Sequence, residues 1–342
     1  MVVNKCINFK IYIFISPYIQ SMKNIKIWFT DFYQGFQPSD NPFINILKDR
    51  FSVELDSDSP DFLFYSCYGY DFLHYNCPRI FYTGENLRPD FNLCDYAIGF
   101  DHFEFEDRYL RFPNYALFEG QFEKLTEIKN DGIEDKDYFC NFIYSNNQAN
   151  PIRDQFFHSL NEYKKISSPG KHLNNVNIEI GGRYASDWMF SKIDFQSKCK
   201  FTIAFENSSS PGYTTEKIMH AFLAGTIPIY WGNPKVNLDF NPEAFINYHD
   251  FNNLQELKSE VIRVDQDKEL YEEIMKKPVF RNNMMPENLK KERLIEFLQS
   301  ILNQNLESAF RRPRYGTTIK YESRLKEMIR KKNSFKWKKL FR

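Results

Sequence analysis

The sequence predicts an α/β protein of two domains, each with strands that run parallel to one another. Short apolar runs alternate with segments of helical periodicity, which is typical of strands joined by helical crossovers. The 342 residues exceed the length at which one hydrophobic core usually stops growing. Aromatic residues make up 18% of the chain and supply large side chains for both cores.

The first half of the chain contains five predicted strands and one predicted helix. The strands are expected at 25–29, 51–55, 62–65, 79–83 and 96–100, and the helix at 42–49. Residues 113–137 are polar and charged and contain glycine, a composition typical of a connection between domains. We therefore expect a first domain at 22–125 and a linker at 126–137.

The second half begins again with a strand and ends in helices. Strands are expected at 139–144, 201–205 and near 227–232, and helices at 152–164, from Thr214 or Thr215 onward, within 253–277 and within 288–303. These elements define a second domain at 138–310. Residues 311–342 differ from it in charge and are predicted to form a separate tail.

The segment 201–234 has the layout of an anion-binding site. An apolar strand leads into a polar loop, and a helix follows whose first-turn amides can donate hydrogen bonds to Thr214 or Thr215. Lys217 then lies in the first helical turn, although the helix dipole favours anions at that end. A phosphate group in front of the helix explains the position of this cation.

Three blocks of motifs follow one another along the chain. The first contains FYTGEN at 81–86, DYAIGFD at 95–101 and RYLR at 108–111; the second contains SN at 145–146, PIR at 151–153 and Phe156; the third contains FEN at 205–207, YTTEK at 213–217 and IPIYWG at 227–232. Together they resemble the α1,3/4-fucosyltransferases of glycosyltransferase family 10, in particular its bacterial members. The third block is similar to the donor-site signature of that family, and the first to its acceptor-side segment.

The resemblance implies a fold, a reaction and a role for each domain. The fold would be GT-B, in which two Rossmann-like domains face a cleft, with 22–125 binding the acceptor and 138–310 binding GDP-fucose. The reaction would be inverting transfer of L-fucose from GDP-fucose to the 3-hydroxyl of N-acetylglucosamine in a lactosamine-type glycan, giving a Lewis-type product. The alternatives are a related transferase that uses another nucleotide sugar, or an inactive carbohydrate-binding protein at the membrane.

Glu85 is predicted to be the general base. Inverting glycosyl transfer needs a carboxylate that accepts the proton of the attacking hydroxyl. Glu85 follows the predicted strand 79–83, so we expect it at the carboxyl end of a strand, where open α/β sheets bind ligands. The resemblance gives the matching glutamate this role. An ordinary exposed glutamate is the alternative.

Lys217 and Arg153 are predicted to stabilise the leaving diphosphate, which requires positive charge. Arg153 lies in the first turn of a predicted helix that opens with Pro151, so both cations are placed at helix N-termini. The resemblance makes both of them donor ligands. Without it, Arg153 would be expected to pair with Asp154 or Glu162.

The resemblance implies four further site residues. Asn207, Tyr213 and Glu216 match family residues that hold the ribose, fucose or base region of the donor. Glu216 is also predicted to be catalytic, because a carboxylate near the anomeric carbon stabilises oxocarbenium character in the transition state. Arg183, which follows two glycines, is a donor-site candidate for which a structural role is the alternative.

No metal ion or other cofactor is predicted to take part. Three D-x-D triplets, at 56–58, 135–137 and 265–267, match the pattern with which metal-dependent glycosyltransferases bridge a divalent cation to a diphosphate. None of them follows the donor loop, and Arg153 with Lys217 already neutralises the leaving group. His220 and His249 have no partners at ligand spacing, so we expect them in core or loop positions.

Charge separates the C-terminal tail from the rest of the chain. Residues 311–342 hold 13 Lys and Arg against two Glu, whereas the rest holds 32 basic and 43 acidic residues, so +11 and −11 cancel. Apolar residues among the lysines predict a basic amphipathic helix that binds anionic membrane surfaces through 316–342. A solvated or RNA-binding tail is the alternative, although no nucleic-acid partner is predicted.

The six cysteines form no C-x-x-C pair and show no zinc-ligand spacing, which indicates a reducing compartment. With the basic tail, this predicts a cytoplasmic protein that is peripheral on the cytoplasmic face of the membrane. Residues 1–21 are too short and too interrupted by Lys10 and Pro17 to span a bilayer. Because Met22 precedes a more natural first strand, they are treated as an uncertain N-terminal extension.

Overall fold

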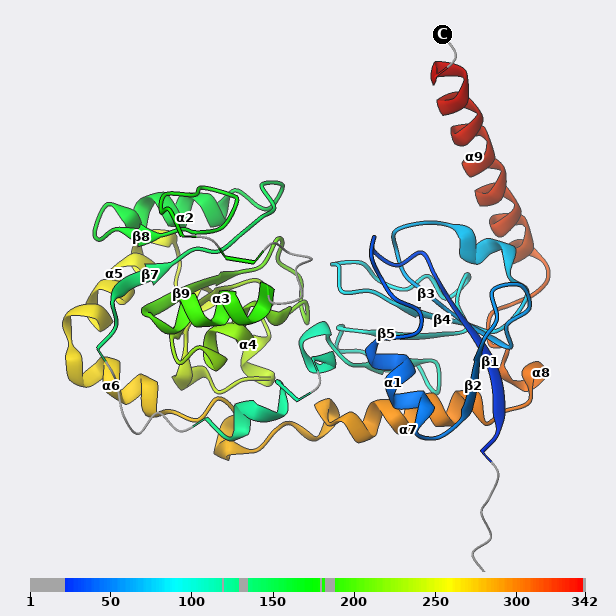
Figure 1. Cartoon of the computed structure of the whole chain (residues 1–342), viewed down its shortest axis with the longest axis horizontal. Coiled ribbons are helices and arrows are strands. Elements are labelled where there is room, and N and C mark those ends of the chain that lie inside the picture. Colours follow the sequence, from blue (N-terminus) through cyan, green and yellow to red (C-terminus); the bar gives the residue numbers. More distant parts are fainter. Residues whose placement is uncertain (1–21, 119, 129–134, 179, 182–187, 341–342) are drawn as a thin grey trace, which may run out of the picture.

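The computed structural model describes residues 22–118, 120–128, 135–178, 180–181 and 188–340, which form two domains, each built on a parallel sheet (Figure 1). The first sheet contains β1 (Asn24–Thr30), β2 (Ser52–Leu55), β3 (Phe62–Tyr65), β4 (Arg79–Tyr82), β5 (Tyr96–Gly99) and β6 (Tyr109–Arg111). Their order is β2-β1-β3-β4-β5-β6, and all neighbouring pairs are parallel. The five strands predicted for the first half are confirmed.

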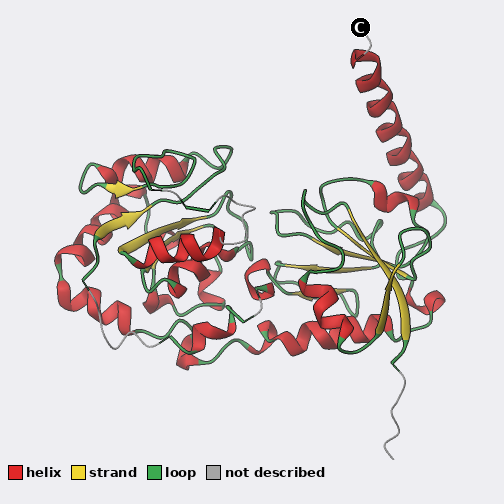
Figure 2. Cartoon of the chain, in the orientation of Figure 1, coloured by secondary structure: helices red, strands yellow, loops and turns green. Residues whose placement is uncertain are grey.

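The second domain has a five-stranded parallel sheet of order β11-β10-β9-β7-β8. Its strands are β7 (Tyr138–Asn141), β8 (Ile166–Ser167), β9 (Cys199–Phe205), β10 (Ile227–Trp231) and β11 (Ile246–Asn247). Helices surround them (Figure 2), namely α2 (Ile152–Asn161), α3 (Trp188–Ser197), α4 (Glu216–Leu223), α5 (Leu254–Gln266) and α6 (Lys268–Lys276). The sequence does not predict β6, β8 and β11, because strands of two or three residues are too short to show a period.

Helix α1 (Pro42–Lys48) shows how local sequence sets these elements. Asn41 caps its start, because the side-chain oxygen accepts hydrogen bonds from the amides of Phe43 (3.1 Å) and Ile44 (3.0 Å). Phe43, Ile44 and Leu47 share one face and are buried in the core of the first domain. Each buried side chain of this kind contributes roughly 1.5–3 kcal/mol, which holds the helix in place.

Beyond residue 287 the chain returns to the first domain. Helices α7 (Lys291–Leu302) and α8 (Leu306–Ala309) lie along it (Figure 1). The spacing of Leu294, Leu298 and Ile301 gives α7 an apolar face, which is buried in the same core as Ile27 and Ile98. The predicted end of the second domain at 310 is therefore wrong, because an amphipathic helix does not show in its sequence which sheet it covers.

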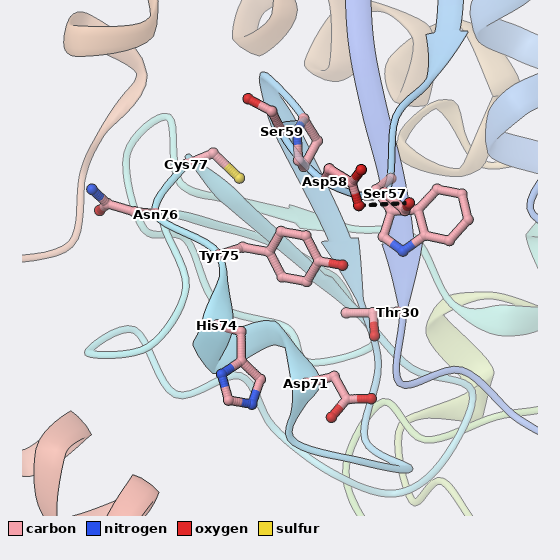
Figure 3. A pocket seen from close by; sticks show the side chains of 11 residues that line it. Thr30, Ser57, Asp58, Ser59, Asp71, His74, Tyr75, Asn76 and Cys77 are labelled. Atoms are coloured by element: carbon pink, nitrogen blue, oxygen red, sulfur yellow. Dashed lines mark hydrogen bonds between the residues drawn. The ribbon is translucent and has the colours of Figure 1, made fainter.

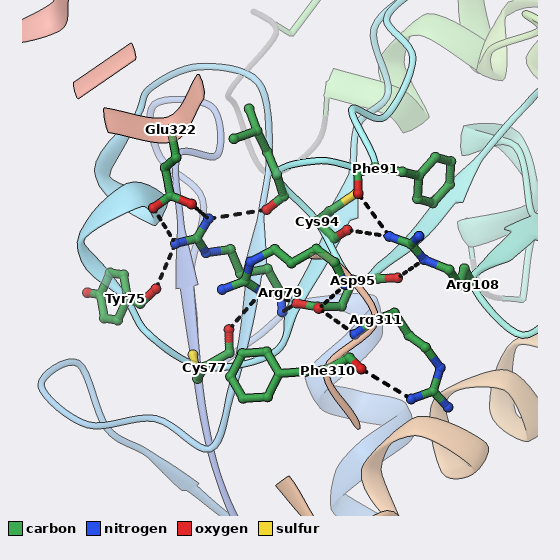
Figure 4. Close-up of polar contacts among 12 residues, drawn as sticks. Tyr75, Cys77, Arg79, Phe91, Cys94, Asp95, Arg108, Phe310, Arg311 and Glu322 are labelled. Carbon is green, nitrogen blue, oxygen red and sulfur yellow. Dashed lines mark hydrogen bonds and ion pairs between the residues drawn. The ribbon is translucent and has the colours of Figure 1, made fainter. Parts of the chain in front are cut away.

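The root of the predicted tail is also part of the globular structure (Figure 4). The carboxylate of Asp95, which is 0% exposed, accepts hydrogen bonds from the amides of Arg311 (2.8 Å) and Arg312 (2.9 Å) and pairs with the Arg312 guanidinium. Arg79, 2% exposed, pairs with Glu322 at 3.1 Å. The boundary predicted at 311 is wrong. Asp95 and Arg79 are buried charges of the first domain that need partners of opposite charge, and Arg312 and Glu322 of the predicted tail are those partners.

Helix α9 (Thr317–Leu340) leaves the first domain and extends away from it (Figure 1). Leu325 and Ile329, near the middle of the helix, still pack against the domain. Among the described residues, none of the helices combines the length and apolar character needed to cross a membrane. Residues 1–21, and 129–134 of the predicted linker, lie outside the described residues.

Candidate active site

Loops that follow β4 and β9 touch each other across the two domains. The Asn86 amide donates hydrogen bonds to the hydroxyls of Ser208 (2.8 Å) and Ser210 (2.9 Å). Gly212 approaches Phe100 so closely that a Cβ would lie 2.3 Å from the Phe100 carbonyl oxygen, and its φ of +86° also favours glycine. Open parallel sheets bind ligands at these carboxyl ends of their strands, so the meeting of the loops marks a candidate site.

A buried ion pair fixes the two domains next to these loops. Arg111, the last residue of β6, donates to both carboxylate oxygens of Asp239, at 3.0 and 2.6 Å. The Arg111 and Asp239 side chains are 9% and 2% exposed, and paired hydrogen bonds of this kind are both strong and directional. The domains are therefore joined by a specific contact as well as by packing.

Glu85 lies where it is predicted, just beyond the carboxyl end of β4. Its amide donates to the hydroxyl of Thr83 (3.1 Å), and its Oε1 accepts a hydrogen bond from the hydroxyl of Tyr68 (2.7 Å). The Glu85 side chain is only half-buried. Because an ionised carboxylate has about four acceptor positions, it retains capacity for the hydroxyl of a substrate.

A buried carboxylate that is not among the predicted site residues organises the start of α4. Glu206 follows β9, is 0% exposed, and accepts hydrogen bonds from the amide and hydroxyl of Thr215 (both 2.7 Å) and from the Lys217 ammonium (2.9 Å). The helix begins where predicted, with Thr215 before its first residue, but the Thr215 side chain does not cap it. Its hydroxyl donates to Glu206 instead.

Lys217 is consequently held by a protein carboxylate at a helix N-terminus. Burial alone would lower its pKa, but the carboxylates of Glu206 and Glu216 raise it well above its usual value. The side chain is 15% exposed, so it remains accessible from solvent. The structure thus provides a permanently charged cation at the position predicted for a phosphate ligand.

Glu216 is the first residue of α4 and is half-buried. Burial raises its pKa, but nearby Lys217, Lys192 and His220 lower it to about 2, so it is ionised at neutral pH. Lys192, on α3, is 9% exposed with its Nζ 3.3 Å from Nδ1 of His220, and burial lowers its pKa to about 8. The sequence does not predict Lys192 as a site residue. The polar and apolar residues of α3 follow no clear helical period, so the pattern does not show which side of the helix is buried.

Arg153 and Asn207 are brought together at the carboxyl ends of β7 and β9. The Arg153 guanidinium is buried, lies 4.3 Å from the ring centroid of Tyr144 and donates to the Asn207 side-chain oxygen at 3.4 Å. The alternative contact with Asp154 is also present, at 3.5 Å, whereas Glu162 pairs elsewhere. Strand order reverses between β7 and β9, which is where doubly wound sheets bind ligands.

Tyr213 connects the two sides of the site. It is 3% exposed, and its ring packs against that of Phe100 with centroids 5.3 Å apart. Burial raises the pKa of its hydroxyl, and carboxylates from both domains raise it further. These are Glu206, Glu85 and Glu216. The Tyr213 side chain is thus buried where the two domains meet, whereas Arg183 lies outside the described residues.

Among the described residues, no three His, Cys, Asp or Glu side chains are grouped to hold a metal ion. In two D-x-D triplets, Asp56 and Asp265 are already paired with lysines. His220 is a buried core residue and His249 lies in a short turn, as predicted. Whether the reaction needs a metal stays a prediction.

Two domains, each with a parallel sheet, whose loops meet at the carboxyl ends of the strands are typical of the GT-B architecture of glycosyltransferases. The model for the α-(1,3)-fucosyltransferase FucT N-terminal domain matches residues 27–118, and that for the C-terminal part of glycosyltransferase family 10 (fucosyltransferase) matches 133–299. The chain therefore belongs to glycosyltransferase family 10, as the sequence motifs predict.

Individual relatives agree with this assignment. The chain is 38% identical over 214 residues to α-(1,3)-fucosyltransferase FucT of Helicobacter pylori, covering 53% of this chain and 43% of that protein. It is 30% identical over 141 residues to 4-galactosyl-N-acetylglucosaminide 3-α-L-fucosyltransferase 9 of Mus musculus, covering 41% and 36%. The matches thus span less than half the length of these two relatives.

Solved structures match over a larger part of the chain. A crystal structure of an α1,3-fucosyltransferase has a TM-score of 0.72 at 28% identity and covers 84% of this chain and 92% of that one. One with GDP-fucose has a TM-score of 0.70 at 29% identity and covers 84% and 93%. These matches confirm the predicted GT-B fold.

Proposed function

We propose that this protein transfers L-fucose from GDP-fucose to the 3-hydroxyl of N-acetylglucosamine in a lactosamine-type glycan, with inversion at the anomeric carbon. Membership of family 10 and the similarity to an α1,3-fucosyltransferase solved with GDP-fucose support the donor. The name of the mouse relative, a 4-galactosyl-N-acetylglucosaminide 3-fucosyltransferase, supports the acceptor. The observation that carries the proposal is the contact of Asn86, beside Glu85, with the loop that leads into α4.

In this mechanism the acceptor oxygen attacks the anomeric carbon while the bond to the β-phosphate oxygen breaks. Glu85 accepts the proton of the attacking hydroxyl, and Tyr68 orients its carboxylate through the 2.7 Å hydrogen bond. Lys217 and the N-terminus of α4 stabilise the departing diphosphate. The ionised Glu216 stabilises positive charge on the fucose ring. GDP and the fucosylated glycan are the products.

Arg153 has a more indirect part in this proposal than Lys217. Its guanidinium is 1% exposed and is occupied by Asn207 and by a carbonyl oxygen of the loop before α2. Arg153 adds positive charge close to the diphosphate and positions Asn207 for the donor. Tyr213, in the loop before α4, packs against Phe100 of the first domain and so lies at the boundary of the site between the domains. Arg183 stays a predicted donor ligand.

The decisive assay measures GDP release and product linkage. Purified protein is given GDP-fucose or another GDP-sugar, with N-acetyllactosamine or its β1,3-linked isomer as the acceptor. Fucose joined to the 3-hydroxyl, identified by nuclear magnetic resonance of the product, is the expected result. Transfer from a different nucleotide sugar would identify the related-transferase alternative, and glycan binding without transfer would identify the inactive one.

Activity is expected to survive removal of divalent cations. Lys217 is charged and supplies positive charge for the leaving diphosphate. Asp56 and Asp265, each part of a D-x-D triplet, are paired with lysines instead of being arranged to bind a metal ion. Initial rates measured with and without excess EDTA should agree within about twofold. Complete loss of activity in EDTA that is restored by Mn²⁺ would contradict this prediction and would favour a metal-binding role for one of the D-x-D triplets.

We further propose that α9 binds anionic lipid and places the protein on the cytoplasmic face of the membrane. Its distal half is rich in lysine, and basic segments gain about 1 kcal/mol per residue near anionic surfaces. Deleting 331–342 should abolish sedimentation with vesicles that contain phosphatidylserine at moderate salt and leave the thermal transition unchanged. Retained vesicle binding would contradict the proposal.

A longer deletion, of 316–342, provides the matched comparison. It also removes Glu322 and leaves buried Arg79 without its carboxylate, so the thermal transition should fall, whereas the shorter deletion spares it. A lost hydrogen bond to a charged group costs about 1.5–3 kcal/mol, which for a chain of this length corresponds to a shift of roughly 2–4 °C. Equal transitions for both truncations, measured by calorimetry, would show that the root of α9 is not structural.

A further inference from the structure

A polar groove on the first domain is separate from the site around Glu85 (Figure 3). Its floor includes Trp28 and Thr30, which alternate along β1 and therefore face the same side of the sheet. The connection 57–60 and the segment 71–77 form its walls. The cavity volume is about 760 Å³, which is within the usual range for small-molecule sites.

The groove presents the functional groups that a hydroxyl-rich ligand requires. Within the described residues, the side chains of Asp71, Tyr75 and Asn76 make no hydrogen bonds, although all three line the cavity. Figure 3 shows the ring of Tyr75 in the middle of the groove, between Asp58 on one side and Asp71 on the other. Tyr75 is only half-buried, so its ring is available for contact with the apolar face of a sugar.

Charge restricts the class of ligand. The described lining contains Asp58 and Asp71 and neither lysine nor arginine. The pKa of Tyr75 is raised by burial and then by neighbouring carboxylates, among them Asp71, Asp31 and Asp58. A negatively charged groove with an aromatic ring and unused donors and acceptors disfavours phosphate or sialic acid and favours neutral sugars.

A chain of hydrogen bonds links the groove to the proposed base. Tyr68 donates its hydroxyl to Glu85 and its amide to the carbonyl oxygen of Asp31 (2.9 Å), whose carboxylate accepts from the amide of Asp71 (3.0 Å). Strands β1 and β4 are separated by β3 alone, a distance on the order of 10 Å. Thr30 of the groove ends β1, at the same edge of the sheet as Glu85.

We propose that this groove binds neutral sugar units of the acceptor that lie beyond the N-acetylglucosamine receiving fucose. The inference rests on the proposed function, because it extends the acceptor site from Glu85 across the segment 66–72. It makes the enzyme selective for acceptors longer than a disaccharide. A neutral glycan that is not an acceptor has the same chemistry, so the experiment must separate binding from transfer.

The test compares kcat/KM for N-acetyllactosamine with that for a neutral tetrasaccharide carrying the same disaccharide at its non-reducing end. The tetrasaccharide should be favoured at least about fivefold by the unaltered protein. Tyr75→Ala and Asn76→Ala should each lower its kcat/KM by about fivefold to tenfold, mainly through KM, and leave the disaccharide within about twofold. Tyr315→Ala is the control, because Tyr315 is an exposed tyrosine that lies outside the segment 66–72 and does not line the groove.

Tyr75→Phe keeps the ring and should retain most of the preference, which separates sugar contact from loss of folding. Equal losses of kcat/KM for both acceptors, or no preference of the unaltered protein for the tetrasaccharide, would refute the proposal that the groove binds acceptor sugars. Neither result would contradict the proposed fucosyl transfer. Calorimetric titration of the tetrasaccharide into the Tyr75→Ala and unaltered proteins is independent of transfer. Groove-dependent binding without transfer to either acceptor would instead refute the proposed function.

Discussion

Replacing Glu85 with glutamine is expected to lower kcat by at least about 10²-fold while the Kd for GDP-fucose stays within a few-fold. Glutamine has nearly the same shape and still accepts the hydrogen bond that Tyr68 donates at 2.7 Å. It cannot accept a proton, so only the step in which the acceptor hydroxyl is deprotonated is affected. Single-turnover transfer and calorimetric titration of GDP-fucose measure the two quantities separately.

Glu104→Gln is the matched control for this substitution. Glu104 is an exposed glutamate of the same domain, and the change alters net charge equally. It should leave both kcat and donor affinity unchanged. Near-normal turnover of the Glu85→Gln protein would remove Glu85 as the base, and equal losses in both variants would indicate a non-specific effect of charge.

Removing the ammonium of Lys217 is expected to have the second large effect, on stability and donor binding together. Lys217→Met leaves the Glu206 carboxylate, which is 0% exposed, without its cation, and breaking a buried pair in this way costs about 3–5 kcal/mol. Loss of a charge-assisted phosphate contact should also weaken GDP binding by about 10-fold to 150-fold. Thermal unfolding and calorimetric titration of GDP measure the two losses.

The double variant Glu206→Gln with Lys217→Met separates the two roles of the lysine. Neutralising Glu206 removes the unpaired buried charge, so much of the lost stability should return. GDP affinity should remain low, because the cation in front of α4 is still absent. Recovery of GDP binding together with stability would show that Lys217 only supports the fold.

Features that depend on neighbouring residues can be predicted from this sequence. The strand Phe62–Tyr65 is observed at its predicted position, because four consecutive apolar residues between turn-forming segments leave few alternatives. The start of α4 beside Thr215 follows from a polar loop that precedes an apolar face. The position of Glu85 beyond β4 follows from the same local pattern.

Contacts between distant residues cannot be predicted in this way. Arg79 and Glu322 are 243 positions apart, and neither residue shows in its surroundings that it has a buried partner. The apolar face of α7 is visible in the sequence, but the core that it covers is not. Glu206 is part of a recognised motif, yet its ion pair with Lys217 depends on how β9 and α4 are packed.

The return of the C-terminal segment has a consequence for biosynthesis. A ribosome releases the strands of the first domain early, but Asp95 obtains its partner only when Arg312 emerges, and Arg79 only when Glu322 does. The apolar face of α7 is also missing from that core until residue 301 has been made. The first domain therefore completes its folding after the second has been synthesised, contrary to the usual N-terminal-first order. A recombinant first domain would have to carry residues 287–330, joined by a linker, to be stable.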